Sequence, residues 1–192
     1  NFGVTFTKYG KMFGYMPYFG FQAGIFYGQE GYQFEYNEDK DYTYNDGFDT
    51  SGIQISKALT INGNDYTIDG KGLSRIFDIE ASNVNLKGLT LINGYCEDDK
   101  GGAILWNGDS GSIVESTLEY NAALAGGAIY WQGTNGNVDH CKFNRNNATD
   151  EYGYGGAICI NGECLSITSS DFYKNYALDE GDGGALSVDA DG

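Results

Sequence analysis

The sequence predicts an all-β fold, a right-handed parallel β-helix in which short strands wind around one core in successive coils. The first observation is a double glycine followed by Ala and an aliphatic residue, which begins at residues 101, 126, 155 and 183. Its steps of 25, 29 and 28 residues are typical of stacked-repeat proteins. The second is a large apolar residue with an Asn three positions later, which follows three of the double glycines: Leu118 and Asn121, Phe143 and Asn146, Phe172 and Asn175.

The third observation is a series of short segments that alternate apolar and polar residues. Two such triplets precede the first double glycine: 53–55, 59–61 and 66–68, then 76–79, 84–86 and 89–91. Turns rich in Gly, Asn and Asp separate the segments, and no helical pattern lies between them. A βαβ fold is therefore disfavoured, and we expect three short strands in each coil.

The later coils can be aligned with these triplets. The first strand, 53–55, aligns with residues 103–105, 128–130 and 157–159. The second strand contains residues 113–114, 138 and 165–167 of the later coils, and the third contains Leu118, Phe143 and Phe172. Like residues then stack about 4.8 Å apart. The double glycine predicts a sharp corner with close backbone approach. A ladder of hydrogen-bonded side chains is expected from Asn93, Asn121, Asn146 and Asn175.

The chain divides into two parts. Residues 1–48 hold sixteen of the 29 aromatic residues and lack the repeat, which predicts an aromatic-rich N-terminal cap or assembly segment. An aromatic platform that stacks on sugar rings is the functional alternative. Residues 49–192 form the parallel β-helix coils, and they stop just past a repeat start, so we expect this region to be truncated at its C-terminal end.

The net charge of −16 argues against a nucleic acid partner, because phosphate contacts require Lys and Arg. It is compatible with a soluble, self-repelling surface or with binding of divalent cations or a basic partner. No apolar run is long enough for a transmembrane segment.

Acidic loops precede three of the four double glycines and predict a calcium site. Oxygen-rich clusters suit Ca²⁺, a hard cation, if the loops emerge at one corner of the helix. An exposed acidic edge is the alternative interpretation. No cofactor other than Ca²⁺ is expected. The candidate ligands are Asp98, Asp99, Asp150, Glu151, Asp179, Glu180 and Asp182.

Two covalent modifications are suggested by short motifs. Asn147 begins the only glycosylation sequon of the chain, which would carry a sugar in a secreted protein. Cys159 and Cys164 flank an Asn-Gly turn, so a local disulfide between them is geometrically feasible. Small buried thiols within the stack are the alternative.

Residues 41–192 resemble the adhesin-like proteins of methanogenic archaea, in the segments 53–57, 59–63 and 67–70. The double-glycine unit with its downstream aromatic and Asn is also similar to the polymorphic outer-membrane proteins of chlamydiae, although Leu118 replaces the usual Phe in one coil. Residues 1–36 match neither family. The resemblance implies a large, secreted, surface-displayed repeat protein that is used for attachment.

We therefore expect a non-enzymatic extracellular or cell-surface protein that mediates attachment or self-assembly into a surface structure or fibre. Its partners would be glycans or proteins of a host or neighbouring cell, or copies of itself. Open coil ends are sheet edges that can pair with another chain.

A polysaccharide lyase or hydrolase that acts on an acidic glycan is the alternative function. Lyases that resemble this fold use a basic residue beside acidic calcium ligands, but neither Arg75 nor Arg145 lies in an acidic cluster of the sequence. Hydrolases of the galacturonan type rely on close Asp pairs near a His and Gly motif, which is absent. A Ser-His-Asp triad would require His140, which precedes Cys141 between two predicted strands, and we interpret it as structural.

Overall fold

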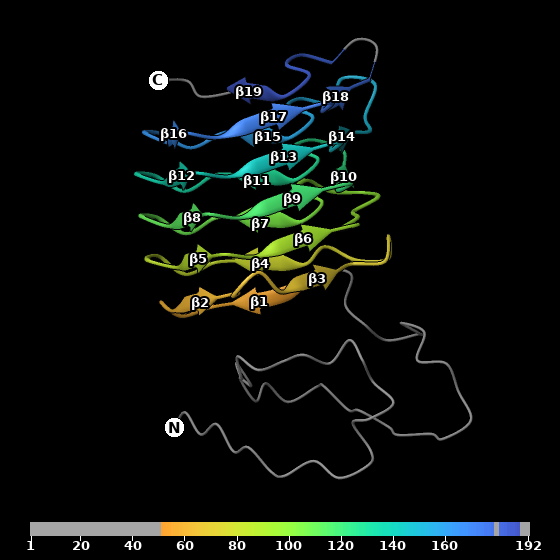
Figure 1. Cartoon of the computed structure of the whole chain (residues 1–192). Coiled ribbons are helices and arrows are strands. Elements are labelled where there is room, and N and C mark those ends of the chain that lie inside the picture. The colour runs from red at the N-terminus through yellow and green to blue at the C-terminus, as the bar shows by residue number, and fades with distance from the viewer. Residues whose placement is uncertain (1–50, 179–180, 189–192) are drawn as a thin grey trace, which may run out of the picture. The chain divides into compact units, whose positions relative to one another are not determined.

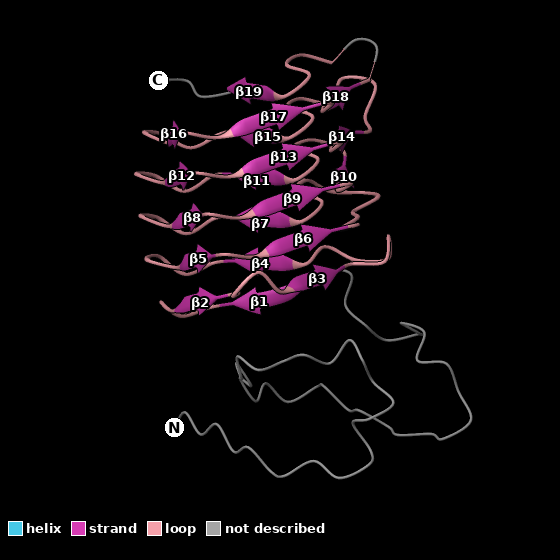
Figure 2. Cartoon of the chain, in the orientation of Figure 1, coloured by secondary structure: helices cyan, strands magenta, loops and turns pink. Residues whose placement is uncertain are grey.

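The described part of the protein is a β-solenoid of about five coils, built from strands and turns without any helix (Figures 1 and 2). The structure is a computed structural model, and it describes residues 51–178, 181–188. It confirms the predicted parallel β-helix. The predicted cap at residues 1–48 lies outside the described residues.

Each coil passes through three or four short strands, and successive coils stack in the order of the sequence (Figure 1). The first two coils are β1 (Ile53–Ile55), β2 (Thr60–Asn62) and β3 (Thr67–Asp69), then β4 (Phe77–Ile79), β5 (Asn85–Lys87) and β6 (Thr90–Ile92). The third coil is β7 (Ile104–Trp106), β8 (Ser112–Val114), β9 (Thr117–Glu119) and β10 (Ala122–Ala123). The fourth is β11 (Ile129–Trp131), β12 (Asn137–Asp139), β13 (Lys142–Asn144) and β14 (Asn147–Ala148). The fifth is β15 (Ile158–Ile160), β16 (Ser166–Thr168), β17 (Asp171–Tyr173) and β18 (Tyr176–Ala177), and β19 (Leu186–Val188) follows.

The strands form four parallel sheets that run along the stack. We name them after their position in the coil: the first sheet (β1, β4, β7, β11, β15, β19), the second (β2, β5, β8, β12, β16), the third (β3, β6, β9, β13, β17) and the fourth (β10, β14, β18). The predicted strands are all present, with one shift of register. Ile53 pairs with Phe77, and Phe77 pairs with Ile104, so the first strand of the third coil begins at Ile104 and not at Ala103.

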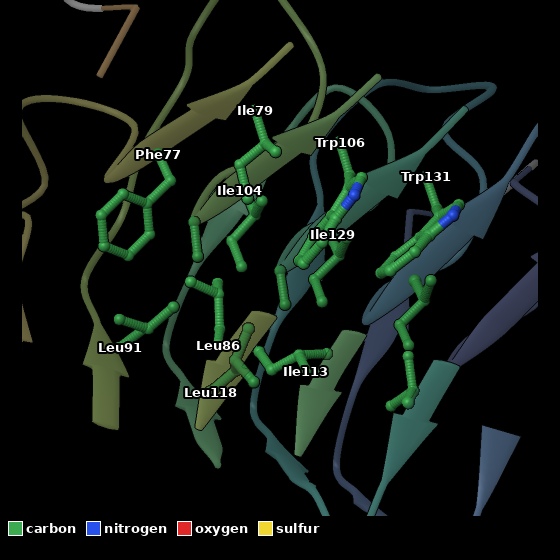
Figure 3. Close-up of a cluster of buried hydrophobic side chains, with 14 of the residues drawn as sticks. Phe77, Ile79, Leu86, Leu91, Ile104, Trp106, Ile113, Leu118, Ile129 and Trp131 are labelled. Carbon is green, nitrogen blue, oxygen red and sulfur yellow. The ribbon is translucent and has the colours of Figure 1, made fainter. Parts of the chain in front are cut away.

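This shift brings two tryptophans into the core. Because side chains alternate across a strand, Ile104 and Trp106 both point inward, while Leu105 points outward. Trp106 stacks on Trp131 of the next coil, with ring centroids 4.2 Å apart, and Phe143 stacks on Phe172 at 4.8 Å. Figure 3 shows Trp106 beside Trp131 and Ile104 beside Ile129. The core is therefore a set of ladders in which each residue packs on its counterpart in the next coil.

The double glycines form the corners that the sequence predicts. Gly101, Gly126, Gly155 and Gly183 all have a positive φ, between 60° and 71°, which favours glycine because it has no Cβ. The second glycine of the pair lies against the backbone of the following coil: a Cβ at Gly127 would collide with the carbonyl oxygen of Gly156. The positive φ of the first glycine and the close backbone approach at the second therefore both require residues without a Cβ.

The asparagine ladder is present, and it runs between the third and fourth sheets. The Asn121 side-chain amide donates to Asn146 Oδ1 at 2.9 Å, and the Asn146 amide donates to Asn175 Oδ1 at 3.0 Å. Each Oδ1 also accepts the backbone N–H of the preceding coil, as in Asn146 N to Asn175 Oδ1 at 3.0 Å. The second proton of each amide goes to a carbonyl, such as that of Leu118 for Asn146. Every polar group of Asn146, which is wholly buried, is thus paired.

Asn93 was predicted as a fourth member of this ladder, and that prediction is wrong. Gly94 takes the place instead, because its N–H donates to Asn121 Oδ1 at 2.8 Å. Asn93 is one residue too early: it has a φ of 51° and donates from its side chain to Asp69.

Replacing Asn146 by Ala should destabilise the fold strongly. The change removes the Oδ1 acceptor of one Asn121 amide proton and of the Asn121 N–H, and it removes the amide donor to the Leu118 carbonyl. Each unpaired buried donor costs about 1–3 kcal/mol, so for two donors a loss of roughly 2–6 kcal/mol in the free energy of unfolding is expected. Urea unfolding followed by circular dichroism measures it. Asn144→Ala is the control, since the Asn144 side chain is outside the ladder: it donates to Glu119 at 3.2 Å and accepts from Arg145 at 3.4 Å. An equal loss in both variants would contradict the ladder's role.

Candidate functional site

The acidic loops predicted to bind calcium are described in part. Asp98 is exposed, and Asp99 forms an ion pair with Arg75. Asp150 accepts the backbone N–H of Tyr152 at 3.0 Å. Glu151 and Asp182 are both exposed. Asp179 and Glu180 lie outside the described residues. Within residues 51–178 and 181–188, no three His, Cys, Asp or Glu side chains lie close enough together to hold a metal ion. A calcium site at these loops stays a prediction.

Arg75 is the centre of a buried polar cluster that ties the loop before the first double glycine to the coil. Its side chain is 2% exposed. Nε donates to the Gly101 carbonyl at 3.0 Å, and Nη2 donates to Asp99 Oδ2 at 2.6 Å and to the Lys100 carbonyl at 2.7 Å. Burial alone would raise the pKa of Asp99, but the hydrogen bond from Arg75 outweighs it and holds that pKa below its ordinary value. This set of partners makes Arg75 an anchor for the loop.

The sequon residue Asn147 lies on β14, the central strand of the fourth sheet. Its side chain is partly buried, and Oδ1 has no hydrogen-bond partner within the described residues. Attachment of a sugar here stays a prediction.

The predicted disulfide between Cys159 and Cys164 is not formed in this structure. Cys159 lies in the middle of β15, where its side chain is 2% exposed and packs with Tyr130 and Ala125 on the outer face of the first sheet. Cys164 is exposed, beyond the turn that ends this strand. The alternative interpretation, a small buried thiol in the stack, therefore describes Cys159. It also describes Cys141, because burial raises the pKa of the Cys141 thiol to about 11.

His140 is exposed at a turn with a φ of 51°. Its Nδ1 lies 2.8 Å from Asp139 Oδ2, and among the described residues no hydroxyl or thiol is hydrogen-bonded to the ring. The geometry needed for an activated nucleophile is therefore not formed around His140.

Two acidic residues lie at the end of one strand of the first sheet. Asp78 is the middle residue of β4, and Glu80 directly follows that strand. Asp78 Oδ1 is buried without a hydrogen-bond partner, and burial, followed by the charge of Glu80, raises the pKa of Asp78. Glu80 accepts a hydrogen bond from Asn107 at 2.7 Å. Two neighbouring carboxyls, one of which has a raised pKa, are an arrangement used by acid–base catalysts.

The feature that the sequence did not reveal lies at the outer corner between the third and fourth sheets. A pocket of about 340 Å³ opens there over the first three coils. Two tyrosines, Tyr95 and Tyr120, line it together with an ion pair of Lys71 and Asp69, whose Nζ and Oδ2 are 2.7 Å apart. Burial alone would raise the pKa of Asp69, but hydrogen bonds from Lys71 and Asn93 outweigh it and hold that pKa below its ordinary value. The pocket thus combines aromatic rings with polar groups that remain charged at neutral pH.

The same corner continues as a row of exposed aromatic and cationic side chains, which we call the corner strip: Tyr120, Arg145, Tyr173 and Lys174. The Arg145 guanidinium lies 5.5 Å from the ring centre of Tyr120 and 5.9 Å from that of Tyr173. Its Nη1 donates to the Tyr120 hydroxyl at 3.1 Å, and Lys174 Nζ lies 4.9 Å from the centre of the Tyr173 ring. Cation–π contacts therefore join three coils on the outside of the solenoid.

Backbone conformation explains why these side chains gather. The residue before each ladder asparagine turns the corner with a positive φ: Tyr120 at 56°, Arg145 at 53° and Lys174 at 53°. Since the ladder occupies the inside of the corner, the preceding side chain is directed outward. The signal available in the sequence was the large residue directly before each Asn of the repeat, which becomes informative only once the corner conformation is known.

No protein-family model, curated protein or solved structure matches the chain. The part of the chain that the structure describes contains no helix that could cross a bilayer.

Replacing Asp99 by Asn should lower the free energy of unfolding at neutral pH. It should also make that free energy less sensitive to acidic pH. Because the pKa of Asp99 is below its ordinary value of 3.8, its ion pair with Arg75 stabilises the fold above that pH and is lost as the pH falls through and below it. The variant lacks this contribution at every pH. Urea midpoints at pH 7 and pH 3 should therefore differ less in the variant than in the wild type. Asp98→Asn is the control, and an identical pH response of the two variants would refute the anchoring role.

Proposed function

We propose that the protein is a non-enzymatic β-helix of the cell surface or extracellular space, which mediates attachment through its outer face or assembles into a surface structure. The observation that carries this proposal is the corner strip. It places exposed tyrosines beside cations on successive coils, and Tyr120 and Tyr173 are 51% and 55% exposed. Tyrosine is enriched at interfaces because its ring packs while its hydroxyl stays hydrated.

The scaffold beneath the strip suits a role in attachment. Each coil is fixed to the next by parallel backbone pairing, by the buried asparagines and by stacked rings such as those of Trp106 and Trp131. Contacts presented by such a core keep their spacing, which reduces the entropy lost on binding. The partners proposed are glycans or proteins of a neighbouring cell, or copies of the chain itself.

The second candidate function is a hydrolase or lyase that acts on an acidic glycan. Asp78 on β4 and Glu80, which directly follows the strand, favour it, because the pKa of the Asp78 carboxyl is raised. Against a lyase, the guanidinium of Arg75 already donates to Gly101, Asp99 and Lys100, so it is not available as a base. We therefore rank attachment above catalysis.

Antibodies raised against the chain should label intact cells of the source organism. Attachment requires display outside the cell, so labelling should be the same before and after permeabilisation, measured by flow cytometry. A cytoplasmic protein of the same cells is the control and should appear only after permeabilisation. Labelling confined to permeabilised cells would overturn the proposal.

The enzymatic alternative is tested with the purified chain and a panel of acidic polysaccharides. Attachment alone predicts no new reducing ends and no ultraviolet-absorbing unsaturated product. If either product appears and is abolished in Asp78→Asn, the second candidate replaces the first.

A further inference from the structure

We propose that the corner strip binds an acidic polysaccharide, a linear sugar polymer that carries carboxylate or sulfate groups. This inference rests on the proposed attachment function and names the ligand class of that surface. Three features of the strip support it: its charge, its aromatic rings and its direction along the solenoid.

The charge of the strip is opposite to that of the protein. The whole chain has a net charge of −16, and three of its described cations lie in ion pairs with carboxylates: Lys71, Arg75 and Lys87. Arg145 and Lys174 differ, because within the described residues no carboxylate lies in salt-bridge distance of either. The nearby Glu119 accepts a hydrogen bond from Asn144. Two cations on adjacent coils without a carboxylate partner are a site for an anion.

The aromatic rings favour a sugar over other anions. Arg145 lies within 6 Å of both the Tyr120 and Tyr173 ring centres, so charge and flat apolar surface alternate over short distances. A pyranose ring offers the matching pattern, with an apolar C–H face and an acid group at its edge. Inorganic anions have no such face. An acidic peptide offers charge without a regular apolar surface, which makes it the weaker fit.

The direction of the strip fits a linear polymer. Asn144 pairs in register with Glu119 and with Tyr173, so Tyr120, Arg145 and Lys174, the residues that follow, occupy equivalent positions of three successive coils. Adjacent strands are about 4.8 Å apart, and the strip therefore extends roughly 10 Å along the axis. Tyr120 also lines the pocket over the first coils, which lengthens the surface in the same direction. A polymer lying along this corner would contact one coil after another.

Binding of immobilised polygalacturonate tests the proposal, with its methyl ester as the uncharged counterpart. The wild type should bind the acid at least about tenfold more tightly than the ester, and binding should weaken as salt rises. The double variant Arg145→Gln, Lys174→Gln should lose about tenfold or more in affinity for the acid. Tyr120→Ala with Tyr173→Ala should weaken binding of both polymers. Dextran sulfate reports whether sulfate is preferred to carboxylate, and binding of either acidic polymer supports the inference.

Matched controls come from the same chain. Lys87→Gln removes a cation from the second sheet, where its salt bridge of 3.1 Å to Glu115 is exposed, and Tyr66→Ala removes a tyrosine that is 50% exposed. Neither should change binding, and circular dichroism verifies that all variants fold. Equal binding of acid and ester, equal binding by the double variant, or tighter binding of polyglutamate would each overturn the inference. Labelling of intact cells would still stand in that case, which separates failure of the ligand class from failure of the attachment function.

Discussion

The rest of this structure depends on one constraint: each coil must turn sharply between the third and fourth sheets without leaving a buried amide unpaired. The ladder of Asn121, Asn146 and Asn175 meets it, because each carboxamide is hydrogen-bonded to a neighbouring coil through both its oxygen and its nitrogen. An apolar side chain in that place would leave backbone N–H groups without acceptors in the interior. The turn, the register of the sheets and the outward direction of the preceding residue all follow from this arrangement.

The two kinds of corner in a coil are stabilised by different means. At the corner between the third and fourth sheets, the ladder asparagine supplies the hydrogen bonds that the backbone lacks. At the double glycine, the absence of a side chain lets the backbones of adjacent coils approach. The first of these corners has a further device, since Arg75 from the coil below holds the loop that leads into Gly101. A regular repeat thus tolerates an irregular loop when one buried cation provides its contacts.

Most of the fold could be predicted from the sequence, and the site could not. Strands such as 53–55 and 77–79 follow from alternation, and the corners follow from the Gly-Gly spacing, because both signals are local. The register error at Ala103 and the misplacement of Asn93 arose because pairing is decided by contacts between coils, which shift by one residue at little cost to a local pattern. The corner strip was missed for the same reason: its residues are 25 and 29 positions apart, and only stacking makes them neighbours.

The stacked tryptophans give the molecule a built-in optical reporter. Trp106 and Trp131 are the only two tryptophans of the chain, both are wholly buried, and they lie in the third and fourth coils. Indole fluorescence therefore senses the middle of the solenoid and is blind to fraying at its first and last coils. In repeat architectures each unit contacts mainly its neighbours, so the ends can open before the centre. During unfolding, the delay between the loss of the spectroscopic signal of the strands and the loss of the tryptophan fluorescence signal would then report how far unfolding has progressed from the ends toward the middle of the solenoid.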